Sequence, residues 1–254
     1  MSLQIGLLQC DHVADDLINI HGNYPEMFEE MLLAVDPDIE MAVYDLTNNL
    51  FPVDLNACDA YIITGSQFSA YDDIPWINKA KQLVTDLYQA KIPTIGICFG
   101  HQLIAESLGG KVDKASDKGW GVGVHHWQVK ENSEWMVTES PKAPKISTSL
   151  KLLKSFALRA SHQDQVTKLP SNAKLFARSD FCPIAGFQID DHILSFQGHP
   201  EFSKAYAKAL IKKRVKRIGE KASQKAVKSL KQETHSETVG AWIVNFIRTT
   251  TKKS

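Results

Sequence analysis

The sequence predicts an α/β fold in which helices flank a doubly wound, mostly parallel central sheet, and two observations support this prediction. Up to Gly110, short and nearly continuous apolar runs alternate with helical patterns, an order that favours buried parallel strands separated by helices. After Gly110, alternating apolar and polar residues favour antiparallel strands, which we expect to complete the same sheet. We therefore expect a single domain over residues 1–254, with residues 203–254 forming carboxyl-terminal helices.

The elements of the first half follow from apolar runs and helical spacing. The expected parallel strands are Leu3 to Gln9, Met41 to Leu46, Ala60 to Thr64 and Thr94 to Cys98. Amphipathic patterns between these runs predict helices over Pro25 to Ala34 and Trp76 to Ala90.

In the second half, Gly121 to Val129 predicts an antiparallel strand by its alternation. The segment Ile184 to Phe196 predicts a hairpin that turns at Asp190-Asp191. Between them, Pro141 to Pro144 predicts a surface loop, because the flanking composition changes too little to indicate a domain linker.

The carboxyl-terminal region predicts two helices. Ser203 to Lys231 is rich in lysine and predicts one amphipathic helix, whose charged face we interpret as solvated; a partner-binding face is the less favoured alternative. Thr234 and Glu237 have capping-box spacing and predict the start of the last helix. The apolar stripe that we expect to close the core consists of Val239, Trp242, Ile243, Phe246 and Ile247.

The charge balance and the cysteine pattern limit the functions that the chain can have. Lys plus Arg equals Asp plus Glu at 29 each, so the chain lacks the basic excess that is typical of nucleic-acid and membrane-surface binders. No apolar segment approaches the ~20 residues of a membrane span. The four cysteines are scattered without a CxxC pair, which disfavours a zinc site and a secreted disulfide framework. We expect no nucleic-acid partner, no membrane, no metal and a cytoplasmic location.

The segment Ile92 to Gly110 contains the strongest candidate for a nucleophile. Cys98 lies where an apolar strand runs into a helix, in the pattern Gly-x-Cys-x-Gly made by Gly96 and Gly100. Glycines relieve crowding where a strand turns sharply into a helix, as in the nucleophile elbow of α/β-hydrolases, and a helix amino terminus favours the thiolate. The alternative is that Cys98 is a small buried apolar residue, which is our interpretation of the other three cysteines.

A second segment, Ile193 to Phe202, is an apolar strand that ends in Gly-His-Pro-Glu. Pro200 favours extended geometry at the residue before it, so His199 and Glu201 can point the same way and form a hydrogen bond. A carboxylate on one ring nitrogen leaves the other to accept the proton of a thiol. Taken alone, the segment is also compatible with an ordinary loop. Together with the elbow, it predicts a catalytic triad of Cys98, His199 and Glu201.

These two segments, Gly-Ile-Cys-Phe-Gly-His-Gln and Gln-Gly-His-Pro-Glu, closely resemble the signatures of class I glutamine amidotransferases. Within that family the chain is similar to stand-alone relatives of the GMP synthetase amidotransferase domain and to the γ-glutamyl peptidases of plants. The resemblance spans the chain to about Glu201 and implies a flavodoxin-like sheet. It extends to Ile63 to Ser66, Asp72 to Ile77, Trp120-Gly121 and Ser161 to Val166.

The resemblance also implies roles for residues around the triad. The backbone N–H groups of Gly65 and Phe99 would form the oxyanion hole. Gln102 and the backbone of Ser161 and His162 would hold the α-amino and α-carboxylate ends of a glutamyl group.

Two further features of these motifs need an interpretation of their own. Many relatives have Gly-Gly where this chain has Gly65-Ser66. We expect His101 to pack behind the elbow and His162 to contribute through its backbone and orientation, so that neither acts as the base.

The function that these residues predict is hydrolysis of the γ-glutamyl amide of glutamine through a thioester, without a cofactor. The released ammonia would pass to an acceptor on a separate synthetase subunit, because the chain has no Gly-x-x-x-x-Gly-Lys nucleotide-binding loop. One alternative is a γ-glutamyl peptidase that acts on glutathione-like compounds. Another is a non-catalytic binding or regulatory module that retains the fold.

Overall fold

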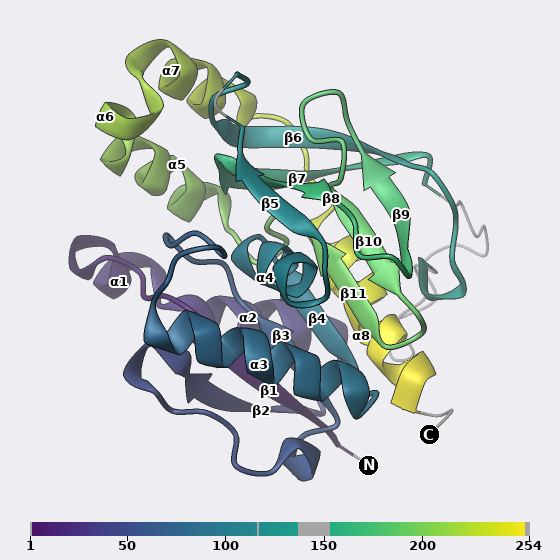
Figure 1. Ribbon diagram of the computed structural model, residues 1–254. Coiled ribbons are helices and arrows are strands. Elements are labelled where there is room, and N and C mark those ends of the chain that lie inside the picture. The colour runs from purple at the N-terminus through teal and green to yellow at the C-terminus, as the bar shows by residue number, and fades with distance from the viewer. Residues whose placement is uncertain (1, 116, 137–152, 252–254) are drawn as a thin grey trace.

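A long mixed sheet organises the chain (Figure 1). The computed structural model describes residues 2–115, 117–136 and 153–251. Five adjacent strands at one end of the sheet run parallel, and each of the four strands beyond them runs antiparallel to its neighbours. Within the described residues, the 9-stranded sheet has the order β2 (Ile39–Asp45), β1 (Leu3–Gln9), β3 (Ala60–Ile63), β4 (Thr94–Ile97), β11 (Ile193–Phe196), β10 (Gly186–Ile189), β9 (Ala173–Arg178), β6 (Gly121–Val129) and β7 (Ser155–His162).

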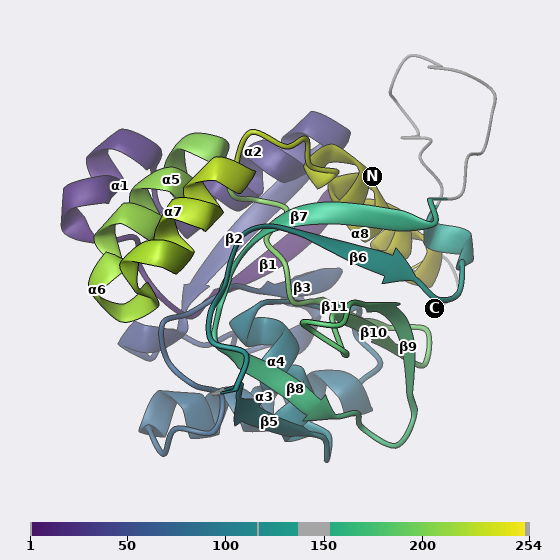
Figure 2. The same ribbon diagram turned by 90° about the horizontal axis from the view of Figure 1, so that it is seen from above.

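Helices cover both faces of the parallel half of this sheet (Figure 2). One face is covered by α2 (Tyr24–Val35) and α8 (Ser236–Thr251), and the other by α3 (Pro75–Gln89) and α4 (Phe99–Ser107). The remaining described helices are α1 (Asp15–His21), α5 (Lys204–Lys213), α6 (Val215–Ile218) and α7 (Glu220–Ser229). They lie at one end of the molecule, where α5 contacts α1 and α7 packs on β6.

The smaller elements complete the described chain. A two-stranded antiparallel sheet of β5 (Lys111–Lys114) and β8 (Asp164–Lys168) lies apart from the main sheet. The short 3₁₀ helices are η1 (Leu46–Asn48), η2 (Leu55–Ala57) and η3 (Glu134–Met136).

The predicted fold class is confirmed, since a doubly wound parallel half continues into antiparallel strands in one sheet. The run Leu3 to Gln9 coincides with β1, and Gly121 to Val129 coincides with β6. The predicted hairpin turns at Asp190, whose φ of 51° is in the left-handed region. The loop predicted at Pro141 to Pro144 lies outside the described residues.

The prediction of one helix over Ser203 to Lys231 is wrong. The segment forms α5, α6 and α7, which are separated at Arg214 and Gly219. Gly219 has a φ of 90°, which lies outside the helical region and ends α6 there. The last helix begins at Ser236, two residues beyond the expected cap at Thr234.

The sheet topology brings distant parts of the chain to one edge. β3, β4 and β11 are adjacent parallel strands, and their paired registers end at Ile63 with Gly96 and at Ile97 with Phe196. The loops that follow these strands therefore emerge side by side, at the edge where doubly wound sheets place their ligands. Gly65, Cys98 and His199 each lie in one of these loops.

Candidate active site

Cys98 occupies a strained turn between β4 and α4. Its φ of 53° and ψ of −98° are unusual for a residue with a side chain. The turn depends on the flanking glycines. A Cβ at Gly96 would lie 2.6 Å from the carbonyl carbon of Gly100, and a Cβ at Gly100 would lie 2.4 Å from the carbonyl oxygen of Ile63. The sequence reaches this conformation because neither position has a side chain.

Hydrogen-bond donors and the amino terminus of a helix surround the Cys98 sulfur. The residue immediately precedes the first turn of α4, where backbone N–H groups and the helix dipole favour negative charge. The Gln197 side-chain amide donates to Sγ at 3.6 Å. The Cys98 residue is only 5% exposed but lines a pocket, so ligands can reach its sulfur.

His199 and Glu201 form a buried hydrogen-bonded pair next to this elbow. His199 Nδ1 lies 2.7 Å from Glu201 Oε1. The Phe202 ring stacks on the imidazole, with ring centroids 3.8 Å apart and an interplanar angle of 9°. The spacing around Pro200 thus gives the geometry expected from the sequence, and the stacked ring fixes the plane of the imidazole.

The charge state of His199 is set by competing effects. Burial alone would lower the pKa of its imidazole, but the Glu201 carboxylate and the charge and hydrogen bond of Cys98 outweigh it and raise this pKa to about 10. At neutral pH the imidazole is therefore protonated beside the sulfur. The imidazolium can therefore donate a proton beside the Cys98 sulfur.

The loop after β3 lies against both of these side chains. A Cβ at Gly65 would lie 2.8 Å from His199 Cε1 and 3.6 Å from Cys98 Cβ. The loop is anchored by Thr64, whose Oγ1 accepts from the Cys10 N–H at 2.9 Å and whose carbonyl accepts from the Gly100 N–H at 3.2 Å. A glycine is thus required here because a methyl group would press on the His199 imidazole, whereas its contact with Cys98 would be an ordinary one.

Asp11 holds the far side of the same loop. Its carboxylate accepts from the Gln67 backbone N–H at 2.7 Å and from the Gln67 side-chain amide at 3.1 Å. Asp11 is 7% exposed, so these bonds act in a shielded place. No sequence motif singled out this aspartate, because its partner lies more than fifty residues away.

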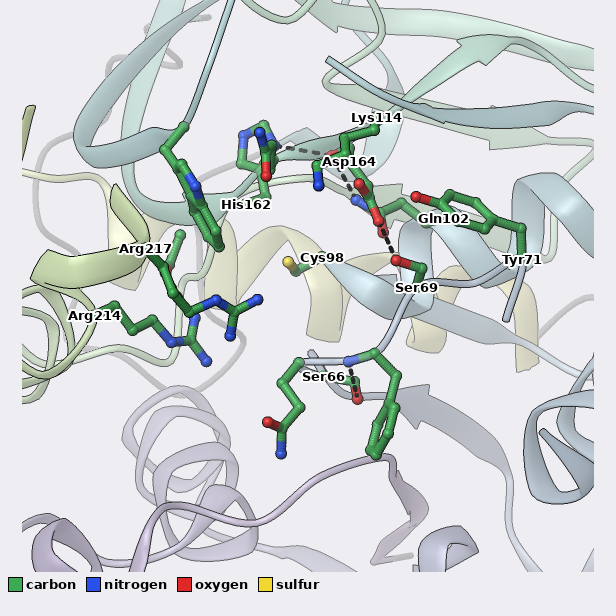
Figure 3. Close-up of a pocket in the computed structure, with 15 residues that line it drawn as sticks. Ser66, Ser69, Tyr71, Cys98, Gln102, Lys114, His162, Asp164, Arg214 and Arg217 are labelled. Carbon is green, nitrogen blue, oxygen red and sulfur yellow. Dashed lines mark hydrogen bonds between the residues drawn. The ribbon is translucent and has the colours of Figure 1, made fainter. Parts of the chain in front are cut away.

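A pocket of about 110 Å³ opens above Cys98 (Figure 3). Its wall includes Gln102, Ser161 and His162, the three residues that were predicted to hold the substrate. The Gln102 side-chain amide donates to the Asp164 carbonyl at 2.8 Å and to Gln197 Oε1 at 3.2 Å. Both of its amide hydrogens are thereby used, which leaves the Gln102 oxygen as an acceptor.

The two histidines inside the motifs are buried and neutral. Burial lowers the pKa of His101 to about 3, and its Nδ1 lies 2.9 Å from Ser195 Oγ. Burial also lowers the pKa of His162 to about 3, and its Nδ1 donates to the Asp164 carbonyl at 3.1 Å. Neither environment favours a role as the base.

Comparison with known proteins decides the family. A model of the family described as glutamine amidotransferase class-I matches residues 17–218. The chain belongs to this family. Residues 96–102 and 197–201, which suggested the resemblance, both lie inside the matched region.

Relatives of the chain within this family have more than one name. Gamma-glutamyl peptidase 3 of Arabidopsis thaliana is 35% identical over 151 residues, which cover 59% of this chain and 57% of the relative. A GMP synthase (glutamine-hydrolyzing) of Clostridium kluyveri is 33% identical over 141 residues, which cover 55% of this chain but 24% of the relative. The match therefore spans little more than half of the peptidase and about a quarter of the synthase.

The fold of the chain also matches solved structures. A glutamine amidotransferase from Thermotoga maritima covers 100% of both chains with a TM-score of 0.73 at 16% identity. Among the described residues, no group of three or more His, Cys, Asp and Glu side chains is arranged to hold a metal ion. None of the described helices is long and apolar enough to span a bilayer.

Arg159 is a residue of the candidate site that sequence reasoning missed. Its carbonyl accepts from the His199 N–H at 2.8 Å, and its guanidinium donates to the Phe202 carbonyl at 2.7 Å. It thus holds both ends of the His-Pro-Glu turn from strand β7. The signal in the sequence was only an arginine in an apolar strand, and its partner could not be read from spacing.

Arg214 and Arg217 were also missed. Both lie in the lysine-rich segment that we interpreted as a solvated face, yet both line the pocket. Figure 3 shows the two guanidinium groups directed into the pocket, across Cys98 from Tyr71 and Gln102. Arg214 donates to Ser161 Oγ at 3.1 Å. The carboxyl-terminal helices therefore contribute to the wall of the site.

Proposed function

We propose that this class I amidotransferase hydrolyses γ-glutamyl amide bonds, with Cys98 as nucleophile, His199 as its proton-transfer partner and Glu201 as the residue that orients His199. The proposal rests on the buried imidazole of His199. Its Nδ1 lies 2.7 Å from the Glu201 carboxylate, and its pKa is raised to about 10 beside Cys98. A thiolate next to an imidazolium combines the nucleophile and the acid that acyl transfer requires.

In the first half of the reaction, the Cys98 thiolate attacks the γ-carbonyl carbon, and the carbonyl oxygen becomes an oxyanion. The backbone N–H groups of Gly65 and Phe99 would stabilise this oxygen. The closeness of Gly65 to both catalytic side chains supports this role. As the tetrahedral intermediate collapses, the C–N bond breaks and His199 gives its proton to the departing amine, leaving a γ-glutamyl thioester.

In the second half, a water molecule attacks the thioester while neutral His199 takes its proton. The C–S bond then breaks, glutamate leaves, and the imidazolium and thiolate are restored. Gln102 would hold the glutamyl amino end through its remaining oxygen, and the Ser161 and His162 backbone would hold its carboxylate end. The buried and neutral state of His162 favours such a positioning role over a role as base.

Two leaving groups are compatible with this chemistry. Glutamine would release ammonia, which would pass to an acceptor on a separate synthetase subunit, as the name of the synthase relative suggests. A γ-glutamyl peptide would release an amino acid or peptide, as the name of the peptidase relative suggests. The reducing cytoplasm is the proposed compartment, and the unpaired state of all four cysteines is compatible with it.

Glutamate release from glutamine, γ-glutamyl dipeptides and glutathione tests the proposal, with the Cys98→Ala protein as control. We expect release from at least one compound, and a loss of at least about 10³-fold in kcat on removing the sulfur. A Cys98→Ala protein with unchanged turnover would refute the proposal. Turnover of none of the compounds by the unmodified protein would instead favour the non-catalytic binding module.

A further inference from the structure

The pocket above Cys98 is cationic in a chain that is neutral as a whole. Its lining contains Lys114, Arg214 and Arg217 but a single acidic side chain, Asp164. The chain itself has 29 basic and 29 acidic residues, so positive charge is concentrated here. The Asp164 carboxylate is in turn engaged by Ser69 Oγ at 2.6 Å. A pocket with this charge selects for an anionic ligand.

The two arginines are held in place by contacts that leave their charge uncompensated. The Arg217 guanidinium lies over the Trp120 ring, 5.4 Å from its centroid. The Arg214 guanidinium donates to the hydroxyl of Ser161. Among the residues that the structure describes, neither guanidinium forms an ion pair with a carboxylate. They are therefore oriented and available to a ligand.

The spacing of the pair follows from the break in the helix. Arg214 is the junction between α5 and α6, and Arg217 is three residues further on, within α6. Residues three apart share one face of a helical turn, so both side chains can reach the same ligand group. The Gly219 break ends α6 directly after this turn.

We propose that Arg214 and Arg217 form a subsite for a carboxylate of the leaving group, so that the preferred substrates are γ-glutamyl peptides with a free carboxylate on the residue after the glutamyl group. This inference rests on the proposed γ-glutamyl hydrolysis and specifies its substrate class. Glutamine is a zwitterion without net charge, and its leaving group is ammonia. It would leave the guanidinium pair unused, whereas a peptide carboxylate can accept from both.

The same cations could instead bind the α-carboxylate of the glutamyl group, which every γ-glutamyl substrate has. Two compounds separate these sources, because γ-glutamylglycine and γ-glutamylglycinamide differ only in the carboxylate of the leaving group. The kcat/KM of each compound would be measured on the unmodified protein, on Arg217→Gln and on Arg214→Gln/Arg217→Gln. Lys216→Gln is the matched control, because Lys216 is an exposed cation on the same helix that does not line the pocket.

We expect the unmodified protein to prefer γ-glutamylglycine over its amide. The double substitution should lower kcat/KM for the acid by about 10- to 100-fold and change that for the amide less than about 3-fold. Arg217→Gln, which alters an exposed side chain, should show part of the same loss with an unchanged thermal midpoint. Lys216→Gln should change neither substrate.

Two results would overturn the inference while leaving the proposed function intact. An active protein that cleaves acid and amide equally well would show that the leaving-group carboxylate is not recognised. Equal losses on both substrates in the arginine variants would assign the pair to the glutamyl α-carboxylate instead. Absence of turnover on every γ-glutamyl compound would refute the proposed function, and this inference would fall with it.

Discussion

The backbone conformation of Cys98 by itself places the sulfur at the start of a helix, independently of the neighbouring side chains. Its left-handed φ of 53° turns the chain directly from β4 into α4 and leaves the sulfur at the helix amino terminus. The side-chain amide of Gln197 then donates to this sulfur, and the charged imidazole of His199 lies beside it. At the scale of single residues, we therefore expect the reactivity of Cys98 to depend on its position in the fold more than on its being a cysteine.

The other three cysteines show the contrast. Cys10 and Cys182 are fully buried, and desolvation raises the pKa of the Cys10 thiol strongly and that of Cys182 to about 12. Cys58 is buried as well. None of them lines the pocket that Cys98 lines. A soft electrophile shaped like glutamine should therefore find one reactive sulfur.

The contact between Glu201 and His199 predicts how activity depends on pH. Because the Glu201 carboxylate, together with the charge and hydrogen bond of Cys98, raises the pKa of His199 to about 10 against the effect of burial, the acid proposed to protonate the leaving amine persists to high pH. Activity should therefore decline only as the pH rises through this value. Replacing Glu201 with Gln removes the charge that favours the imidazolium, so the basic limb of kcat/KM against pH should move at least about one unit lower. We also expect a drop in kcat of about 10²- to 10⁴-fold.

The His-Glu account would be contradicted by a basic limb that stays in place in Glu201→Gln. The pH profile is the informative readout here, because a simple loss of activity could follow from misfolding. The thermal midpoint of the variant gives the corresponding control.

The proposed contribution of Gly65 to the oxyanion hole can be tested by substitution. In Gly65→Ala, the new methyl group would lie 2.8 Å from His199 Cε1, so either the loop or the imidazole must move. A displaced backbone donor costs about 10²- to 10³-fold in kcat at such sites. Single-turnover acylation of the protein measures this loss. An alanine variant that acylates at the unmodified rate would exclude a close catalytic role for this loop.

At the scale of elements, sequence reasoning succeeded where a pattern is local. The parallel strands β1, β3 and β4 are short buried apolar runs, and α3 shows helical spacing throughout. The strand-to-helix turn at Cys98 could be predicted because Gly96 and Gly100 each lie only two residues from the cysteine in the sequence. Gly-His-Pro-Glu could be predicted because its hydrogen bond joins residues two apart.

Sequence reasoning failed where an element depends on distant partners. Asp11 binds the loop that contains Gln67, and Arg159 binds the turn that ends at Phe202, so both contacts join residues far apart along the chain. The helix over residues 203–231 was predicted as continuous because its apolar spacing continues across Arg214 and Gly219, whereas the backbone breaks at both. The error concealed the two arginines of the pocket wall.

The tight turn between β4 and α4 predicts how a substitution at Gly100 changes the stability of the protein. A Cβ at Gly100 would lie 2.4 Å from the Ile63 carbonyl, and backbone atoms cannot move aside easily. We expect Gly100→Ala to lower the free energy of unfolding by about 3 kcal/mol or more. The matched control is Gly240→Ala in α8, where the nearest atom is the flexible Met31 Cγ at 3.3 Å. That change should be near neutral or stabilising by up to about 1 kcal/mol.

Denaturant unfolding of both alanine variants would measure these changes. If Gly100→Ala were as stable as Gly240→Ala, the close approach of α4 to β3 would not be what requires a glycine in the elbow. The comparison is direct because both positions are helical and both substitutions add one methyl group.

At the scale of the whole molecule, the order of strands in the sheet brings the residues of the candidate site together. Adjacent parallel strands β3, β4 and β11 deliver Gly65, Cys98 and His199 to one edge, although more than 130 residues separate the first from the last. The antiparallel half then adds Ser161 and His162 from β7, and the carboxyl-terminal helices add the arginines. The parallel half thus supplies the proposed chemistry, and the later elements supply the wall that would select the substrate.

The central claim is that the Cys98 sulfur is the nucleophile and that His199 activates it. Mass spectrometry after incubation with a glutamine-like diazo-ketone tests this most directly, on the unmodified protein and on His199→Gln. We predict one adduct, on Cys98, and labelling of His199→Gln slowed by about 10²-fold or more. An adduct on Cys10, Cys58 or Cys182 in place of Cys98, or equal labelling rates in the two proteins, would contradict the account.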